Sequence, residues 1–270
     1  MGDPVELTYG QVALAASLIL VNGAISLWLR LGLSRTLLWA SLRATTQLLL
    51  VGLVLEWVFR LDRLEGVLVV ASVMTLIAGV TANGRNGYRY PGIGWNTIVS
   101  VWASGWLVAG FALLIVIRDE SSWYRPQYAI PLLGMILGNT LNGITVGLNT
   151  FTESLYGQRA GVETRLALGA SRREAALPLI RKSLRLGMMP IINSMLVVGI
   201  VSLPGMMTGQ ILSGTAPIEA VKYQIVILFL IASGTAVGTT TAVLLSYRRL
   251  FTRGHRFESA KLVRSQDAGD

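Results

Sequence analysis

The chain has few of the side chains that soluble enzymes use for chemistry. Its 270 residues include no cysteine and one histidine, His255, and charged residues make up only 14%. Without cysteine there are no disulfides, thiolate metal sites or thiol nucleophiles. Soluble domains usually carry about 25% charged residues. The low charge, together with a hydrophobic content of 53% in long runs, therefore indicates a membrane protein.

Enzyme signatures are also missing. None of the three lysines, Lys182, Lys222 and Lys261, follows a glycine, so the chain has no phosphate-binding G-x-x-x-x-G-K-[ST] loop. It contains no H-E-x-x-H zinc motif and no G-x-S-x-G nucleophile turn. We therefore expect a chain that is not itself an enzyme and holds no cofactor of its own.

Long apolar runs recur along the chain, and each is close to the roughly 20 residues that cross a bilayer. The predicted spans are Leu7–Leu29, Thr36–Phe59, Gly66–Ala82, Trp95–Ile117, Tyr128–Phe151, Met188–Leu212 and Tyr223–Tyr247. The acidic start has no Lys or Arg, unlike a signal peptide, so we expect the first span to stay in the mature protein. The predicted fold is an all-α, polytopic membrane bundle of about seven helices. A single transmembrane domain would cover residues 1–250, and a basic cytoplasmic tail residues 251–270.

The net charge of +9 is explained by the positive-inside rule rather than by nucleic acid binding. With the N-terminus outside, the segments predicted to be cytoplasmic hold 17 Lys and Arg residues and the outer segments hold 5. This asymmetry predicts a cytoplasmic C-terminus in a cell (inner) membrane protein. Basic side chains of the tail are expected to lie against anionic membrane lipid.

One basic, amphipathic insertion interrupts the apolar pattern: residues 153–187, here called the platform. Gly169 is expected to end one short helix. Ser171, followed three residues later by Glu174, forms a capping-box pattern that starts the next helix. Two short helices at an angle on the cytoplasmic face form a shape suited to docking with another protein.

The fifth and sixth spans carry most of the polar and thioether side chains at membrane depth. The candidates for a substrate path are Asn139, Asn142, Asn193, Met195, Met206, Met207 and Gln210. Pro190, Pro204 and Gly205 are expected to break the sixth span, and broken helices often mark transport sites. Hydrogen bonding between helices explains the amides equally well, and core packing explains the methionines.

Small residues four apart recur in the last three spans, a pattern that lets helix backbones approach closely. The pairs are Gly134/Gly138, Gly143/Gly147, Gly205/Gly209 and Gly234/Gly238. Packing within one protomer and packing between subunits both remain open.

The platform resembles the coupling segment of ABC-transporter permeases. Glu163, five intervening residues and then Gly169-Ala170-Ser171 follow the E-A-A-x3-G and L-G-A-S patterns, although Thr164 and Arg165 replace the two alanines. The resemblance implies that a cytosolic ABC ATPase subunit, which binds the ATP, docks on this segment. The residues it assigns to ATPase coupling are Glu163, Leu168, Gly169, Ala170, Ser171 and Glu174.

The run from Met188 to Leu212 extends the resemblance. With the span layout, it is similar to the bacterial iron-export ABC permease family (FetB type), which includes plant aluminium-tolerance permeases, over nearly the whole chain. The resemblance implies a permease subunit, acting as a homodimer, that exports iron or another metal or small solute.

The residues themselves do not identify the cargo. The spans hold no His or Cys and almost no carboxylates, so no metal ligand set can be named. Ferric ions prefer oxygen ligands, whereas a methionine-rich path suits soft ions or apolar solutes. A seven-span receptor or sensor, which would dock a signalling protein on the platform, is an alternative. A secondary transporter is another, although the scarcity of membrane carboxylates counts against it.

Overall fold

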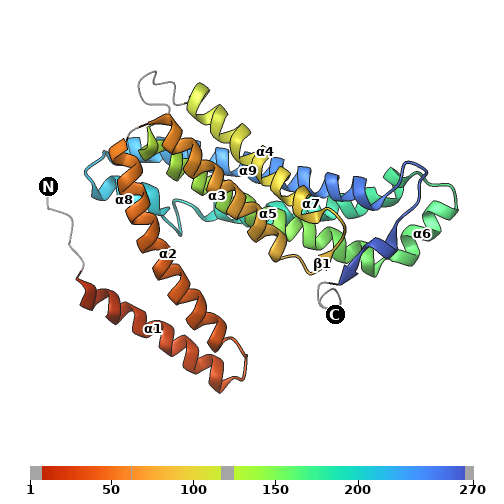
Figure 1. Ribbon diagram of the computed structural model, residues 1–270, viewed down its shortest axis with the longest axis horizontal. Helices are drawn as coiled ribbons and strands as arrows, with labels where there is room; N and C mark the ends of the chain where they lie inside the picture. The colour runs from red at the N-terminus through yellow and green to blue at the C-terminus, as the bar shows by residue number, and fades with distance from the viewer. Residues whose placement is uncertain (1–7, 62, 117–124, 265–270) are drawn as a thin grey trace. The chain divides into compact units, whose positions relative to one another are not determined.

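The structure, a computed structural model, describes residues 8–61, 63–116 and 125–264, and they are mostly helical (Figure 1). The described residues up to 61, with 212–214, form one compact unit, and the remaining described residues form a second. Among the described residues, six helices are long and apolar enough to cross a membrane. The predicted all-α, polytopic membrane architecture is therefore confirmed.

The first unit is a pair of apolar helices, α1 (Tyr9–Trp28) and α2 (Ser34–Leu61), which pack against each other. Large apolar side chains cover both helices, and the Trp28 side chain, for example, is 81% exposed. Such an apolar surface on isolated helices is typical of segments that face lipid.

The second unit contains the remaining elements. In chain order these are α3 (Leu64–Gly84), β1 (Tyr88–Arg89), α4 (Ile93–Phe111), a π-helical segment (Ala112–Val116), α5 (Pro126–Gly157), α6 (Arg159–Ala167), α7 (Arg172–Val197), α8 (Gly205–Leu212, with Leu212 grouped with the first unit), α9 (Pro217–Leu250), a 3-10 helix (Ser259–Lys261) and β2 (Val263–Arg264). The central helix is α5, which packs against α3, α4, α7 and α9 and carries the largest set of buried residues.

Glycines allow α5 and α7 to approach α9 closely. A Cβ added at Gly143 of α5 would lie 2.5 Å from the Thr235 methyl carbon of α9. A Cβ at Gly187 of α7 would lie 2.6 Å from Cγ2 of Thr239 and 2.9 Å from the Gly143 carbonyl oxygen. These distances are too short for any side chain, so α5 and α7 meet backbone to backbone, and both lie directly against threonine side chains of α9.

Only some of the predicted small-residue pairs serve this packing. The pair in α9, Gly234 and Gly238, lies against Ile136 and Thr140 of α5. By contrast, an added Cβ at Gly138, Gly205 or Gly209 would meet nothing within 4 Å. Packing between helices of one protomer therefore accounts for the pairs Gly143/Gly147 and Gly234/Gly238.

The predicted sixth span, residues 188–212, is not one helix. Pro190 lies inside α7, which continues to Val197, and the chain is irregular from 198 to 204 before α8 begins. Gly199 in this break has a φ of +83°, in the left-handed region that glycine adopts readily. The break is therefore real, but it lies at residues 198–204 rather than at Pro190.

The predicted platform is less separate from the bundle than its polarity indicates. Residues 153–157 are the last turn of α5, and residues 172–187 are the first two thirds of α7. Only α6 and the turn 168–171 lie between these two helices. A force applied near Gly169 would therefore act directly on two helices that continue into the apolar bundle.

The segment after α9 folds back onto the second unit. Phe251 is 1% exposed and lies in a core cluster with Leu155 of α5, Val162 of α6 and Leu179 of α7. Strand β2 pairs antiparallel with β1, with Arg264 opposite Tyr88. The described part of the basic tail is thus a packed element at the end of the bundle where α5 meets α6.

The close contact of α7 with α5 and α9 can be tested by adding one methyl group to α7. We expect Gly187→Ala to lower the free energy of unfolding by about 1–3 kcal/mol, because the Gly143 backbone cannot move away easily. Thermal unfolding of the purified protein in detergent measures the change. The matched control is Gly138→Ala on α5, where the added methyl group has open space. Equal melting temperatures for the two variants would contradict the assigned packing.

Candidate functional site: an exposed elbow and a membrane cavity

The first candidate site is a sharp bend between α6 and α7, here called the elbow, residues 158–174. Helix α6 ends at Ala167, and Gly169 turns the chain with a φ of +91°. The backbone N–H of Ala170 donates to the Arg165 carbonyl at 3.0 Å, which closes the end of α6. Because Gly169 supplies the left-handed conformation, a side chain at this position would strain the turn.

The elbow is anchored on one side and exposed on the other. Val162 of α6 and Ala175 of α7 are buried in the core cluster that also contains Phe251. Leu168, at the tip of the bend, is 82% exposed. An apolar side chain held outward on an anchored turn is a typical anchor residue for a partner protein.

Ser171 and Glu174 form the predicted capping box at the start of α7. The Ser171 Oγ accepts from the Glu174 N–H at 3.3 Å, and the Glu174 carboxylate accepts from the Ser171 N–H at 2.8 Å. These hydrogen bonds from the backbone and side chain of Ser171 hold the pKa of the Glu174 carboxyl below its usual value. The capping box thus sets the direction in which α7 leaves the elbow.

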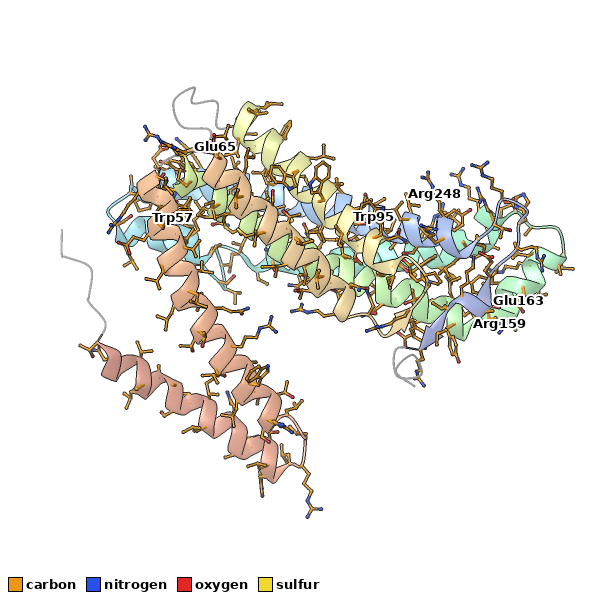
Figure 2. The ribbon with its side chains drawn as sticks, viewed as in Figure 1. Trp57, Glu65, Trp95, Arg159, Glu163 and Arg248 are labelled. Atoms are coloured by element: carbon orange, nitrogen blue, oxygen red, sulfur yellow. The ribbon has the colours of Figure 1, made fainter. Side chains whose placement is uncertain are left out.

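Glu163 lies on α6 and its carboxylate is already engaged (Figure 2). It accepts from Nε of Arg159 at 2.9 Å and from Oγ of Ser259 in the tail at 3.2 Å. The bond from Arg159, with its positive charge, lowers the pKa of the Glu163 carboxyl. Glu163 therefore helps to hold α6 to the tail as well as presenting charge at the elbow.

The tail contacts of the elbow could not be read from the sequence. The backbone N–H of Arg172 donates to Nδ1 of His255 at 2.9 Å, and the Arg172 guanidinium donates to the Thr252 carbonyl at 3.2 Å. These partners are 83 and 80 residues apart. No local pattern in the sequence connects them.

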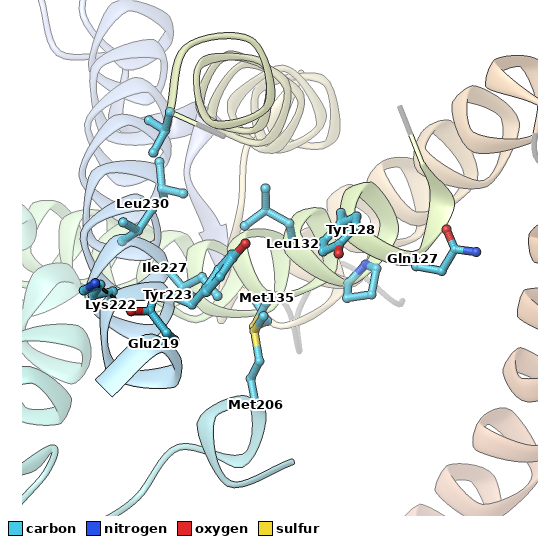
Figure 3. Close-up of a pocket in the computed structure, with 13 residues that line it drawn as sticks. Gln127, Tyr128, Leu132, Met135, Met206, Glu219, Lys222, Tyr223, Ile227 and Leu230 are labelled. Atoms are coloured by element: carbon cyan, nitrogen blue, oxygen red, sulfur yellow. Dashed lines mark hydrogen bonds and ion pairs between the residues drawn. The ribbon is translucent and has the colours of Figure 1, made fainter. Parts of the chain in front are cut away.

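The second candidate site is a cavity of about 310 Å³ between α5, α8 and α9 (Figure 3). Its walls are mainly apolar, and Met135 of α5 and Met206 of α8 point toward each other across it. The polar groups are Gln127, Tyr128 and Tyr223, together with the ion pair between Glu219 and Lys222 at 2.7 Å. The cavity lies near the first turns of α5, so it is about 40 Å along that helix from the elbow.

Of the seven residues predicted for a substrate path, Met206 lines this cavity. Asn139 donates to the Met135 carbonyl within α5, and Asn142 accepts from Arg85 at 3.4 Å. The other four lie on α7 and α8, where Asn193 is exposed and Met195, Met207 and Gln210 are half-buried.

The sequence did not indicate the other residues that line the cavity. Most of them lie on α5 and α9, about 90 positions apart in the chain, and only the fold brings them together. The one local signal was the spacing of Glu219 and Lys222, which favours an ion pair within a helix.

The described residues do not form an evident metal site. They contain no group of three or more His, Cys, Asp and Glu side chains that could hold a metal ion. Within the cavity, Glu219 is the one carboxylate among the lining residues, and Lys222 balances its charge. The cavity can therefore accept an apolar or partly chelated solute, with a few oxygen donors at its wall.

Comparison with known proteins places the chain among membrane proteins. A family model described as "Uncharacterised protein family (UPF0014)" matches residues 9–251. "UPF0014 membrane protein slr1647" of Synechocystis sp. is 38% identical over 92% of this chain and 96% of the relative.

Two further relatives carry names that bear on function. "Probable iron export permease protein FetB" of Escherichia coli is 32% identical over 95% of this chain and 97% of the relative. "Protein ALUMINUM SENSITIVE 3" of Arabidopsis thaliana is 30% identical over 93% of this chain and 90% of the relative. These matches confirm the resemblance inferred from the sequence. No solved structure gives a significant match.

The capping box gives a local test of the elbow. We expect Ser171→Ala to destabilise the start of α7 by about 1 kcal/mol, because one hydroxyl acceptor is lost. Backbone amides of residues 172–176 should exchange with deuterium about fivefold faster, measured by hydrogen-exchange mass spectrometry. Ser194→Ala, later on the same helix, is the control and should leave these amides unchanged.

The same capping box predicts a pH dependence. Because the folded pKa of Glu174 is lowered, its stabilising contribution is complete above the pKa of an unfolded glutamate. This contribution to stability should be lost as pH falls through the lowered pKa that Glu174 has in the folded protein. Glu174→Gln should remove this dependence of stability on pH.

Proposed function

The chain belongs to the UPF0014 family, and from that premise we propose that it is the permease subunit of an ABC transporter. A separate cytosolic ATPase subunit would bind and hydrolyse ATP. Two permease chains, each with one ATPase subunit, would form the working unit in the cell membrane. The cargo would be iron or another small solute, moved out of the cytoplasm.

The exposed elbow is the observation that carries this proposal. An ABC permease needs a rigid contact that takes up the motion of an ATPase, and here Leu168 projects from a turn between two helices that are anchored in the core by Val162 and Ala175. The sequence has no phosphate-binding loop of its own. The E. coli relative, which is named a permease, supports the same function over nearly the full chain.

Helix α7 offers a direct route from the elbow to the cavity. It begins at Arg172 beside the elbow, runs to Val197, and is followed by the break at 198–204 and by α8. Helix α8 carries Met206 into the cavity wall. When ATP binding draws two ATPase subunits together, a shift of the elbow would pass along α7 and through the break to α8, and the resulting movement of Met206 would open or close the cavity.

The charge distribution supports the orientation that this mechanism needs. Residues 152–187, which contain the elbow, and the residues from Arg248 onward hold 13 of the 23 Lys and Arg residues. The positive-inside rule places such segments in the cytoplasm, where an ATPase subunit can reach them.

Substitution of the elbow tip tests the docking. We expect Leu168→Glu to reduce co-purification of the ATPase subunit and export by about tenfold or more, because a charge replaces an apolar anchor. Leu168→Met is the matched control and should retain both. Since Leu168 is 82% exposed, the variant should fold normally, and an unchanged melting temperature checks this. Normal export by a folded Leu168→Glu variant would show that the elbow does not couple the ATPase subunit to transport.

The cavity residues test the class of cargo. If iron passes as a hard cation, Glu219→Gln should lower metal export strongly, since oxygen donors hold such ions. The double substitution Met135→Leu and Met206→Leu preserves side-chain volume. Its metal export should therefore stay within about twofold of that of the original protein. Export is measured as loss of radioactive iron from loaded cells. The reverse pattern would indicate a soft metal held by thioethers, and no effect of either change would place the cargo elsewhere.

A further inference from the structure

A second cavity, of about 640 Å³, lies at the end of the second unit that carries the tail. Its walls come from the loop before α4 with Tyr90 and Pro91, from the start of α7, and from the end of α9 with the tail that follows. The cationic side chains that line it are Arg172, Arg248, Arg249, Arg253 and Lys261. The one carboxylate on its wall belongs to Glu258. We call this space the basic cavity.

The positive charge of the basic cavity is largely uncompensated. Glu258 pairs with Lys261 at 2.7 Å. Within the described part of the chain, none of the four arginines forms an ion pair with a carboxylate. Five cations facing one carboxylate leave a net charge of about +4. A concave surface of one sign concentrates the electrostatic potential and attracts a ligand of opposite charge.

The basic cavity is held in shape by packing. The Arg172 guanidinium donates to the Thr252 carbonyl at 3.2 Å and lies 5.8 Å above the Tyr247 ring. The Arg249 side chain lies against Gly92, where an added Cβ would come within 3.4 Å of Nε. The neighbouring Phe251 is buried. Guanidinium groups held in fixed positions suit phosphate oxygens, which accept two parallel hydrogen bonds from one arginine.

The position of the basic cavity along α9 indicates where its ligand comes from. The 25 residues from Tyr223 to Tyr247 carry no charged side chain, and Arg248 and Arg249 follow at once. The first charged residues after a span lie at the depth of the lipid headgroups. Trp95, near the start of the neighbouring helix α4, is 67% exposed and is a typical interfacial residue (Figure 2).

We propose that the basic cavity binds a phosphate group, and that the headgroup of an anionic phospholipid in the adjoining leaflet supplies it. Free inorganic phosphate presents the same kind of oxygen atoms. The test therefore separates the lipid headgroup from free phosphate. An occupied site would connect Arg172, at the start of α7, with Arg248 and Arg253 beyond the apolar part of α9. The lipid would then stabilise the end of the bundle that holds the elbow.

The experiment measures binding of fluorescent phosphatidylglycerol to the purified full-length chain in a neutral detergent. The triple variant Arg248→Gln, Arg249→Gln, Arg253→Gln should bind about hundredfold more weakly, since each basic group near an anionic lipid contributes about a fivefold factor. The control carries Arg173→Gln and Arg256→Gln, two exposed arginines outside the cavity wall. It should bind within about threefold of the original protein. The same three arginines changed to lysine should keep most of the binding.

Competition then identifies the source of the phosphate group. Displacement by unlabelled phosphatidylglycerol but not by millimolar inorganic phosphate supports the lipid headgroup. Displacement by inorganic phosphate supports the phosphate site but overturns the lipid source. Weakening of about 25-fold by the control, which is the same fivefold factor for each arginine removed, overturns the proposal, because the effect is then one of overall charge.

A loss of ATPase co-purification in the triple variant, with lipid binding unchanged, also overturns the proposal and assigns the arginines to a protein contact. The binding measurement contains no ATPase subunit, so its outcome is separate from that of the Leu168→Glu experiment.

Discussion

The close approach of α5, α7 and α9 is the constraint on which the second unit depends. Gly143 and Gly187 leave no room for a side chain, and Thr239 fills the space between them. In a bilayer there is little hydrophobic driving force between helices, so such backbone contact is a main source of their association. It holds α7 against the central helix along its middle, while the two ends of α7 make different contacts.

Those two ends connect the candidate sites. At one end, the capping box of Ser171 starts α7 from an elbow whose tip exposes Leu168. At the other end, α7 stops at Val197, and a seven-residue break separates it from α8 and Met206. A helix that is packed in its middle and joined to the next helix by an irregular segment can transmit a displacement without unfolding.

The tail adds a second connection at the elbow end. Ser259 donates to Glu163 of α6, and His255 accepts from the backbone of Arg172. The same segment forms one wall of the basic cavity. The tail therefore links the elbow to the end of α9.

The sequence by itself determined the features that depend on near neighbours. Apolar runs identified the membrane helices, the spacing of Ser171 and Glu174 identified a helix start, and Gly169 identified the turn before it. These follow from local backbone preferences and the energetics of burying apolar surface.

Only the tertiary structure decided which distant residues meet. It put Met206 beside Met135, paired Asn142 with Arg85, and folded the tail onto the elbow. It also showed α7 passing through Pro190 and ending at Val197. Contacts between residues 57 to 83 positions apart leave no periodic or spacing pattern in a single chain. The cavity and the tail contacts were therefore beyond sequence reasoning.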